Sequence, residues 1–132
     1  RLDPRLRELA ILQVGYALRS DYEFSQHVKI GRDFGVSDED IQAIAEESAG
    51  QTSVLEPLAR SVLRAAREIA LDHDLSDATF AALDAELDAE GLVDLIATIT
   101  VYIGTAHLLV AFRSDVGDDY RPYLDEFPLP GA

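Results

Sequence analysis

The sequence predicts an all-α protein of about six helices, and three observations carry this prediction. Apolar residues recur three and four positions apart along most of the chain, as they do on the buried face of a helix. Residues that begin and end helices flank these segments. No stretch alternates apolar and polar side chains as a half-buried strand would. A chain of 132 residues, 48% of them apolar, is long enough to form one domain with a real core.

Capping residues predict the helix boundaries. Asp3-Pro4 begins the first helix, because Asp caps a helix N-terminus and Pro fits the first turn. Ser20 or Asp21 caps the second helix, which stops at Gly35. The segment Ser37–Asp40 resembles a capping box, and Ser76 caps a later, shorter helix. We expect helices at about residues 4–18, 21–34, 38–48, 55–72, 77–89 and 92–114, with a break at Glu90-Gly91.

The last helix, about Leu92 to Ser114, is apolar nearly all round. It is about as long as a membrane span, but polar residues along it, such as Asp94 and Thr98, favour a buried core helix. Such a helix has to be covered on every side, and short helices in a small domain do not cover it alone. We therefore predict a homo-oligomer formed through this helix. The tail, residues 115–132, is expected to lie extended, either as a lid or as an oligomer clasp.

The composition narrows the classes of function. Acidic residues outnumber basic ones by 25 to 11, and the net charge of −14 makes nucleic acid and anionic membrane poor partners. The chain has no Cys, which excludes disulfides, thiolate nucleophiles and thiolate metal sites and is consistent with a cytoplasmic protein. There is no Met either, so we expect a single domain that is trimmed at its N-terminus.

The stretch from Ser20 to His27 carries the residues best suited to chemistry. Glu23 and His27 are four positions apart and lie on one helix face, where they can share a proton or hold one ligand. Glu8 lies on the preceding helix. A carboxylate beside an imidazole orients the ring and provides a proton donor or acceptor near neutral pH. The plain alternative is a surface ion pair or a structural hydrogen-bond network.

Three segments resemble a known family. The residues Arg5–Leu12, the pattern Tyr22-Glu23-Phe24-x-x-His27 and the segment Gly35–Ile41 are similar to the carboxymuconolactone decarboxylase / alkylhydroperoxidase D-like family. The resemblance covers most of the chain and is specific in its first third. It implies the alkylhydroperoxidase D-like helical fold and assembly into trimers or hexamers.

The resemblance also concerns the site. Redox members of the family carry a glutamate and then Cys-x-x-Cys-x-x-x-His. Here the glutamate is Glu8 and the histidine is His27, while Ser20 and Glu23 occupy the two cysteine positions. Thiol peroxidase chemistry is therefore excluded, because it needs a reactive thiolate and a resolving thiol. What remains resembles the decarboxylase-type members and implies acid–base catalysis by His27, Glu23 and Glu8.

Other side chains near this stretch are candidates for substrate binding. Ser20 is suited to hydrogen-bond a substrate oxygen, although simple helix capping is its more ordinary role. Tyr22, Tyr16 and Phe24 are suited to wall a pocket for a planar substrate, with core packing as the alternative.

Tyr102 and His107 form a second polar pair, on the last helix. Buried polar groups need partners, so this pair either reaches the His27 site, including across a subunit contact, or bonds the backbone locally. Glu23, His27 and His107 also make a conceivable zinc or iron site. No tight ligand motif occurs, however, and we expect no metal and no other cofactor.

The sequence thus predicts a cofactor-independent enzyme of the carboxymuconolactone decarboxylase-like type. It would perform decarboxylation or lyase chemistry on a small organic acid or lactone through an enolate-like species. The alternative is a non-catalytic, oligomeric or ligand-binding member of the same fold. That alternative predicts a closed or apolar pocket in which Glu8, Glu23 and His27 bond only to one another, whereas an accessible cavity at His27 favours an enzyme.

Overall fold

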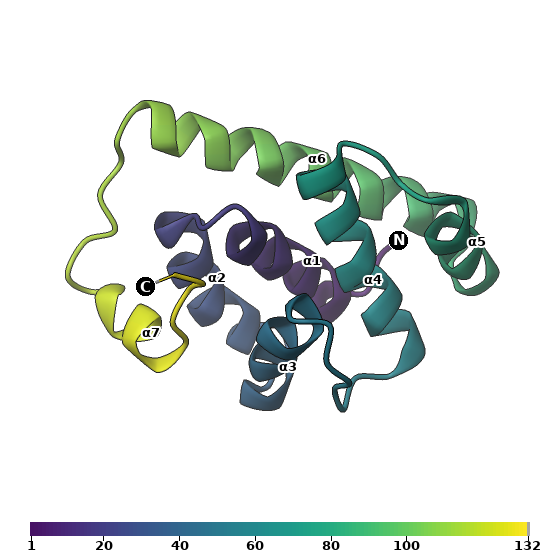
Figure 1. The fold of residues 1–132 in the computed structure, drawn as a ribbon, viewed down its shortest axis with the longest axis horizontal. Helices are drawn as coiled ribbons and strands as arrows, with labels where there is room; N and C mark the ends of the chain where they lie inside the picture. Colours follow the sequence, from purple (N-terminus) through teal and green to yellow (C-terminus); the bar gives the residue numbers. More distant parts are fainter. Residues whose placement is uncertain (132) are drawn as a thin grey trace.

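The computed structural model describes residues 1–131 and has no β-strand in that range. Seven α-helices and one short π-helical segment follow each other along this part of the chain, one α-helix more than expected (Figure 1). They are α1 (Pro4–Ala17), α2 (Asp21–Asp33), α3 (Asp38–Ser48), α4 (Pro57–Arg67), η1 (Glu68–Asp72), α5 (Asp77–Glu86), α6 (Ala89–Ala111) and α7 (Arg121–Glu126). The prediction of an all-α fold is therefore confirmed.

Helix α1 is the centre of the fold. It packs against α2, α3, α4 and α6, so that neighbouring helices surround it (Figure 1). Every residue from Glu8 to Gly15 is buried. Because the helix is enclosed, its polar side chains have little access to water and need partners inside the protein.

The capping residues act as the sequence predicts. The side chains of Asp3, Ser20 and Ser76 accept hydrogen bonds from backbone N–H groups at the starts of α1, α2 and α5. Ser37 forms a reciprocal capping box with the third residue of α3. Gly35, just beyond α2, has a φ of 94°, which glycine adopts without strain. Local signals therefore determine most of the boundaries.

Two expectations about the elements are wrong, and a third is met with one change. Glu90-Gly91 does not break the chain but lies in the first turn of α6, where the Gly91 N–H donates to the Asp88 side chain at 2.7 Å. The helix expected at about residues 55–72 is present from Pro57 to Asp72, but its last part is the π-helical η1. The tail is not extended throughout, because it contains α7.

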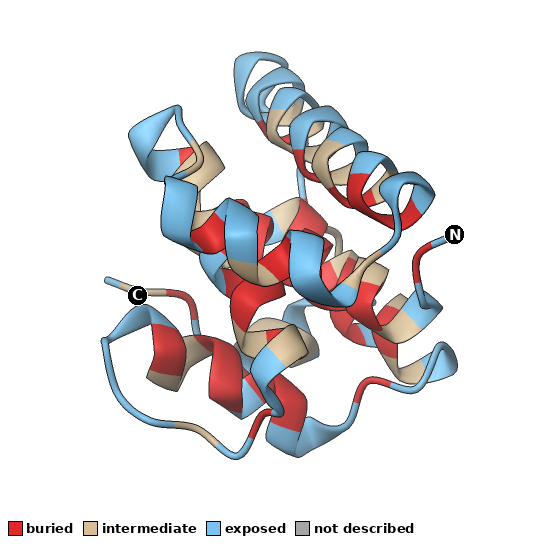
Figure 2. Ribbon diagram, turned by 90° about the vertical axis from the view of Figure 1, so that its right-hand side faces the viewer, coloured by how far each residue is buried: buried red, intermediate tan, exposed pale blue. Residues whose placement is uncertain are grey.

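Helix α6 is not a buried core helix in the single chain, contrary to the expectation. Only 17% of an 18-residue window of α6 is buried. It is the uppermost helix in both ribbon views, with buried residues along its underside and exposed residues over much of the remainder (Figures 1 and 2). Within the described residues, α6 is the one helix long and apolar enough to cross a membrane by length and composition. Much of its apolar surface is left uncovered by residues 1–131.

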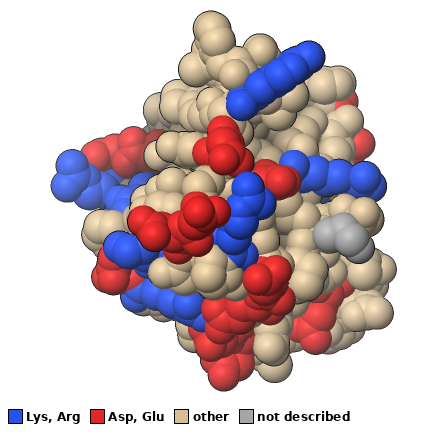
Figure 3. Space-filling model, turned by 90° about the vertical axis from the view of Figure 1, so that its left-hand side faces the viewer, with Lys and Arg blue, Asp and Glu red and all other residues tan. Residues whose placement is uncertain are grey.

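The C-terminal segment packs back onto α2. Arg32 of α2 forms an ion pair with Glu126 at 2.9 Å. Its guanidinium group also lies over the rings of Tyr123 and Phe127. Figure 3 shows the end of the molecule that includes this segment, where acidic and basic side chains are interspersed. The tail therefore covers part of α2 in its own chain.

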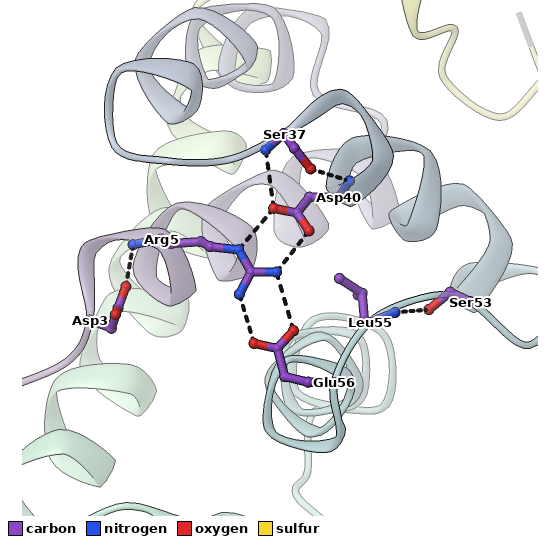
Figure 4. A network of polar contacts seen from close by, with 7 residues as sticks. All are labelled: Asp3, Arg5, Ser37, Asp40, Ser53, Leu55 and Glu56. Atoms are coloured by element: carbon purple, nitrogen blue, oxygen red, sulfur yellow. Dashed lines mark hydrogen bonds and ion pairs between the residues drawn. The ribbon is translucent and has the colours of Figure 1, made fainter.

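Arg5 joins three helical regions through a network of charged groups (Figure 4). Its guanidinium group donates to both oxygens of Asp40 at 2.8 and 2.7 Å, and to both oxygens of Glu56 at 2.8 and 3.2 Å. Burial alone would raise the pKa of Asp40, but the bonds from Arg5 and Ser37 outweigh burial and lower this pKa. Arg5 thus ties α3 and the start of α4 to α1.

We expect Arg5→Met to lower the free energy of unfolding by about 2 kcal/mol at pH 7, because Asp40 would stay buried without its charged partner. Urea unfolding measures the loss. Arg64→Met is the matched control, since Arg64 is an exposed arginine of α4. The pKa of Asp40 is lowered in the folded state, so its contribution is present above the ordinary value of 3.8 and is lost as the pH falls below it. Equal stability of the two variants at pH 7 would contradict this account.

Candidate active site

His27 and Glu8 form the centre of the candidate site. Nδ1 of His27 lies 2.7 Å from Oε1 of Glu8, and Arg7 donates to the other oxygen of Glu8 at 3.0 Å. Burial alone would raise the pKa of Glu8, but the contacts with His27 and Arg7 outweigh burial and lower this pKa. Glu8 is therefore an ionised acceptor, and Nδ1 of His27 carries the proton between them. This leaves Nε2 as the ring nitrogen available to a ligand.

Close packing of α1 on α2 brings these side chains together. A short turn connects the two helices, which run antiparallel. Near this turn, a methyl group on Gly15 would come within 3.2 Å of the backbone nitrogen of Phe24. Glycine therefore permits a close approach that a larger residue would not. Further from the turn, this spacing lets Glu8 and His27 meet within hydrogen-bond distance.

Glu23 is a buried carboxyl group without a partner. It is 3% exposed, and neither of its oxygens has a hydrogen-bond partner among residues 1–131. Burial raises its pKa to about 7. The sequence placed Glu23 beside His27 as its acidic partner, but Glu8 is the residue that bonds the ring. Glu23 instead exists in both protonation states near neutral pH, which suits a group that donates or accepts a proton.

Glu23 and His27 line a cavity of about 180 Å³ between α2 and α6. Tyr102 of α6 packs edge-on against the imidazole ring, with ring centroids 5.3 Å apart. Burial raises the pKa of the Tyr102 hydroxyl, and the charges of the nearby carboxylates raise it further. The cavity therefore brings together the residues Glu23 and His27 and Tyr102, whose hydroxyl is neutral. Its lining residues are Tyr22, Glu23, Gln26, His27, Ile30, Tyr102, Thr105 and Leu109.

Three other candidate residues lie outside this cavity. Ser20 caps α2 and lines a neighbouring hollow. Tyr16 packs against Phe24, with ring centroids 5.9 Å apart, and lines a different hollow. His107 is exposed on α6. The metal site considered from the sequence does not converge, and within residues 1–131 no three His, Asp or Glu side chains are grouped to hold an ion.

Sequence reasoning missed four residues of the cavity lining. Gln26 and Ile30 follow Glu23 on α2 by three and seven positions, so helical spacing places them on the same face and could have found them. Thr105 and Leu109 come from α6. No local signal connects them to α2, since only tertiary packing brings the two helices together.

The fold and the site define an all-α protein in which an antiparallel helix pair holds an acid-bound histidine beside a protonatable carboxyl group. A model of the carboxymuconolactone decarboxylase family matches residues 1–68, the part of the chain that contains Glu8, Glu23 and His27. The chain belongs to this family, which confirms the resemblance. No curated protein and no solved structure gives a significant match to the chain.

We expect Glu23→Gln to remove a pH dependence of stability. The Glu23 pKa rises from 4.5 to about 7 on folding, so the folded state binds more protons between these values and loses stability as the pH rises through them. The loss is on the order of 3 kcal/mol and is complete above pH 7. Urea unfolding at pH 5 and pH 8 compares wild type, Glu23→Gln and the exposed control Glu86→Gln. If the free energy of unfolding of Glu23→Gln fell between pH 5 and pH 8 by as much as that of wild type, Glu23 would not be buried as described.

Proposed function

We propose that the protein is an acid–base enzyme that performs decarboxylation or a related lyase step on a small organic acid, lactone or similar carbonyl compound. The observation that supports this best is Glu23, which lines the same cavity as His27 and whose carboxyl group is buried without a partner among residues 1–131. An unpaired buried carboxyl group costs stability. Its presence beside an imidazole is therefore better explained by chemistry than by folding.

The chemistry follows from the two groups. In a decarboxylation, the bond between the carboxylate carbon and its neighbour breaks, CO2 leaves, and the electron pair moves onto an adjacent carbonyl oxygen as an enolate. A protonated His27, held in place by Glu8 through Nδ1, donates a hydrogen bond from Nε2–H to this oxygen and keeps its proton. Glu23 transfers its single proton to the carbon that lost CO2, the carbonyl re-forms, and Glu23 is left as a carboxylate that takes up a proton from water before the next turnover. No redox step and no thiol are needed.

The alternative is a non-catalytic protein of the same fold, and it predicts a closed or apolar pocket in which Glu8, Glu23 and His27 bond only to one another. Glu8 bonds Arg7 as well as His27, and Glu23 bonds neither Glu8 nor His27. This difference favours the enzyme. Thiol peroxidase activity has no basis in a chain without Cys. We further propose that the protein works in the cytoplasm, without a cofactor.

The proposal predicts that His27→Gln and Glu23→Gln each lower kcat/KM by about 10²- to 10⁴-fold on a substrate found among lactones and β-keto acids. Product formation measured from pH 5 to 9 provides the test. Glu23→Gln is also expected to remove an inflection near pH 7, because the pKa of Glu23 is about 7. Glu86→Gln is the control for a lost surface charge, and circular dichroism checks folding. If both variants fold and their turnover equals that of wild type, His27 and Glu23 have no part in the mechanism.

We also propose that the chain assembles with copies of itself through α6, as a trimer or hexamer. Among residues 1–131, nine large apolar residues are exposed, and five of them lie on α6 or directly after it: Val93, Val101, Leu108, Val110 and Phe112. The chain has no charged residue between Asp94 and Arg113, so this surface can approach a second copy without bringing like charges together. A surface of this kind in a strongly acidic protein suits another α6 better than an anionic membrane.

The assembly is tested by the double variant Val101→Glu/Leu108→Glu. We expect multi-angle light scattering to give an oligomer for wild type and a monomer for the variant, because each glutamate would place a charge in the apolar contact. Val54→Glu is the matched control, since Val54 is 80% exposed and lies in the segment between α3 and α4. A monomeric wild type at micromolar concentration would refute the assembly.

A further inference from the structure

The side chain of Arg7 lies between groups from two helices. Its Nε donates to Oε2 of Glu8 at 3.0 Å, within α1. Its guanidinium carbon lies 4.7 Å from the ring centroid of Phe34, the residue that directly follows α2. Among residues 1–131, Glu8 is the one carboxylate that forms an ion pair with Arg7. Arg7 therefore connects the acid that bonds His27 with the end of the helix that carries His27.

Phe34 is an exposed aromatic residue that core packing does not explain. It is 47% exposed and does not belong to the apolar core. Glu23, His27, Ile30 and Phe34 recur at helical spacing, so Phe34 lies at the end of the α2 face that lines the cavity. The guanidinium group of Arg7 lies over its ring, and the negative face of an aromatic ring attracts a cation. The contact with Arg7 is thus the interaction that accounts for Phe34.

The bond from Arg7 to Glu8 needs such support because the two residues are neighbours on one helix. Successive side chains of a helix point in different directions and do not face each other. The Arg7 side chain is partly exposed and that of Glu8 is buried, so Arg7 has to turn inward from the surface to reach Oε2. The ring of Phe34 favours this orientation of the guanidinium group over the many others that a long side chain adopts in water.

We propose that Arg7 is a positioning residue, which Phe34 holds in place and which keeps the Glu8 carboxylate turned toward Nδ1 of His27. Oε1 of Glu8 bonds the imidazole at 2.7 Å and Oε2 bonds Arg7 at 3.0 Å, so the carboxylate cannot rotate without losing a bond. Without Arg7, Oε2 would stay buried with no partner, which is costly. The carboxylate would then rotate or take up a proton, and either change would loosen its bond to His27. Only the consequence for turnover rests on the proposed function.

The charge of Arg7 reaches a third member of the site, Tyr102 of α6. Burial and then the charges of Glu8 and Glu23 raise the pKa of the Tyr102 hydroxyl, whereas the charge of Arg7 lowers it. Arg7 is therefore a cation that opposes the two acids around the imidazole ring, against which Tyr102 packs edge-on. Its removal should raise the pKa of Tyr102 as well as that of Glu8, and a role in packing alone would change neither.

The experiment is a pH titration followed by NMR spectroscopy, which needs no substrate. The side-chain carboxyl carbon of Glu8 reports its pKa, and the Nδ1 proton of His27 reports how often the bond to Glu8 opens. Burial raises the pKa of Glu8 but contacts with His27 and Arg7 outweigh it, so we expect a higher pKa in Arg7→Met than in wild type. At pH 7 the Nδ1 proton should exchange with water about tenfold faster in this variant, because the charge-assisted bond that fixes Glu8 is lost.

Two further variants and a control separate charge from shape. Arg7→Lys restores the cation and should bring both signals back toward those of wild type. Phe34→Leu keeps an apolar side chain but removes the ring, and it should change both signals in the same direction as Arg7→Met. Because Phe34 is exposed, Phe34→Leu also carries the test if Arg7→Met does not fold. Arg64→Met, which replaces an exposed arginine of α4, should equal wild type.

If the pKa of Glu8 and the exchange rate of the His27 proton are the same in Arg7→Met and wild type, the proposal is overturned. Wild-type behaviour of Phe34→Leu would overturn the part of Phe34. Where wild type turns over a substrate, Arg7→Met should lower kcat about tenfold and leave KM nearly unchanged, and an unchanged kcat would remove Arg7 as a positioning residue. If the NMR signals respond as expected but His27→Gln does not affect turnover, the placement of Glu8 by Arg7 stands and the acid–base mechanism falls.

Discussion

The enclosure of α1 by four other helices is the constraint on which the rest of this structure depends. An enclosed helix cannot leave charged or amide groups without partners, because water does not reach them. At the half-buried start of this helix, Arg5 bonds Asp40, which is buried, and Glu56, which draws α3 and the start of α4 to α1. Gln13 bonds Ser48 and Arg67 in the same way.

The bond between Glu8 and His27 is the third of these polar contacts of α1, and it has a chemical consequence as well as a structural one. It fixes the orientation of the ring and leaves Nε2 for a ligand. Glu23 lies close by but has no such partner, so its pKa moves in the direction opposite to that of Glu8. Two buried carboxyl groups thus acquire different states from their surroundings, one ionised and one protonatable at neutral pH. Such a division is the arrangement that acid–base enzymes use.

Helix α6 has two sides with different roles. Its inner side carries Tyr102, Thr105 and Leu109, which close the cavity over α2. Its outer side is apolar and without cover in the single chain. Assembly through that outer side would hold α6 against α2 and so would keep the cavity between them in shape. The proposals for the assembly and the reaction therefore depend on the position of the same helix.

The sequence by itself determined the helical fold, because its signals are local: apolar residues at helical spacing, and caps at Asp3, Ser20, Ser37 and Ser76. Through the resemblance to the family it also singled out Glu8 and His27, which the structure places 2.7 Å apart. Local reasoning failed at Glu90-Gly91, where the cap at Asp88 outweighs the helix-breaking tendency of glycine.

Only the tertiary structure decided which acid bonds His27. Helical spacing favoured Glu23, four residues away, yet the packing of α1 on α2 at Gly15 brings Glu8 to the ring instead. Tertiary packing also decided that α6 stays largely exposed, since exposure depends on how many helices reach it and not on its own composition. The raised pKa of Glu23 has the same origin, because burial without a partner is a property of the surroundings and leaves no pattern in the chain.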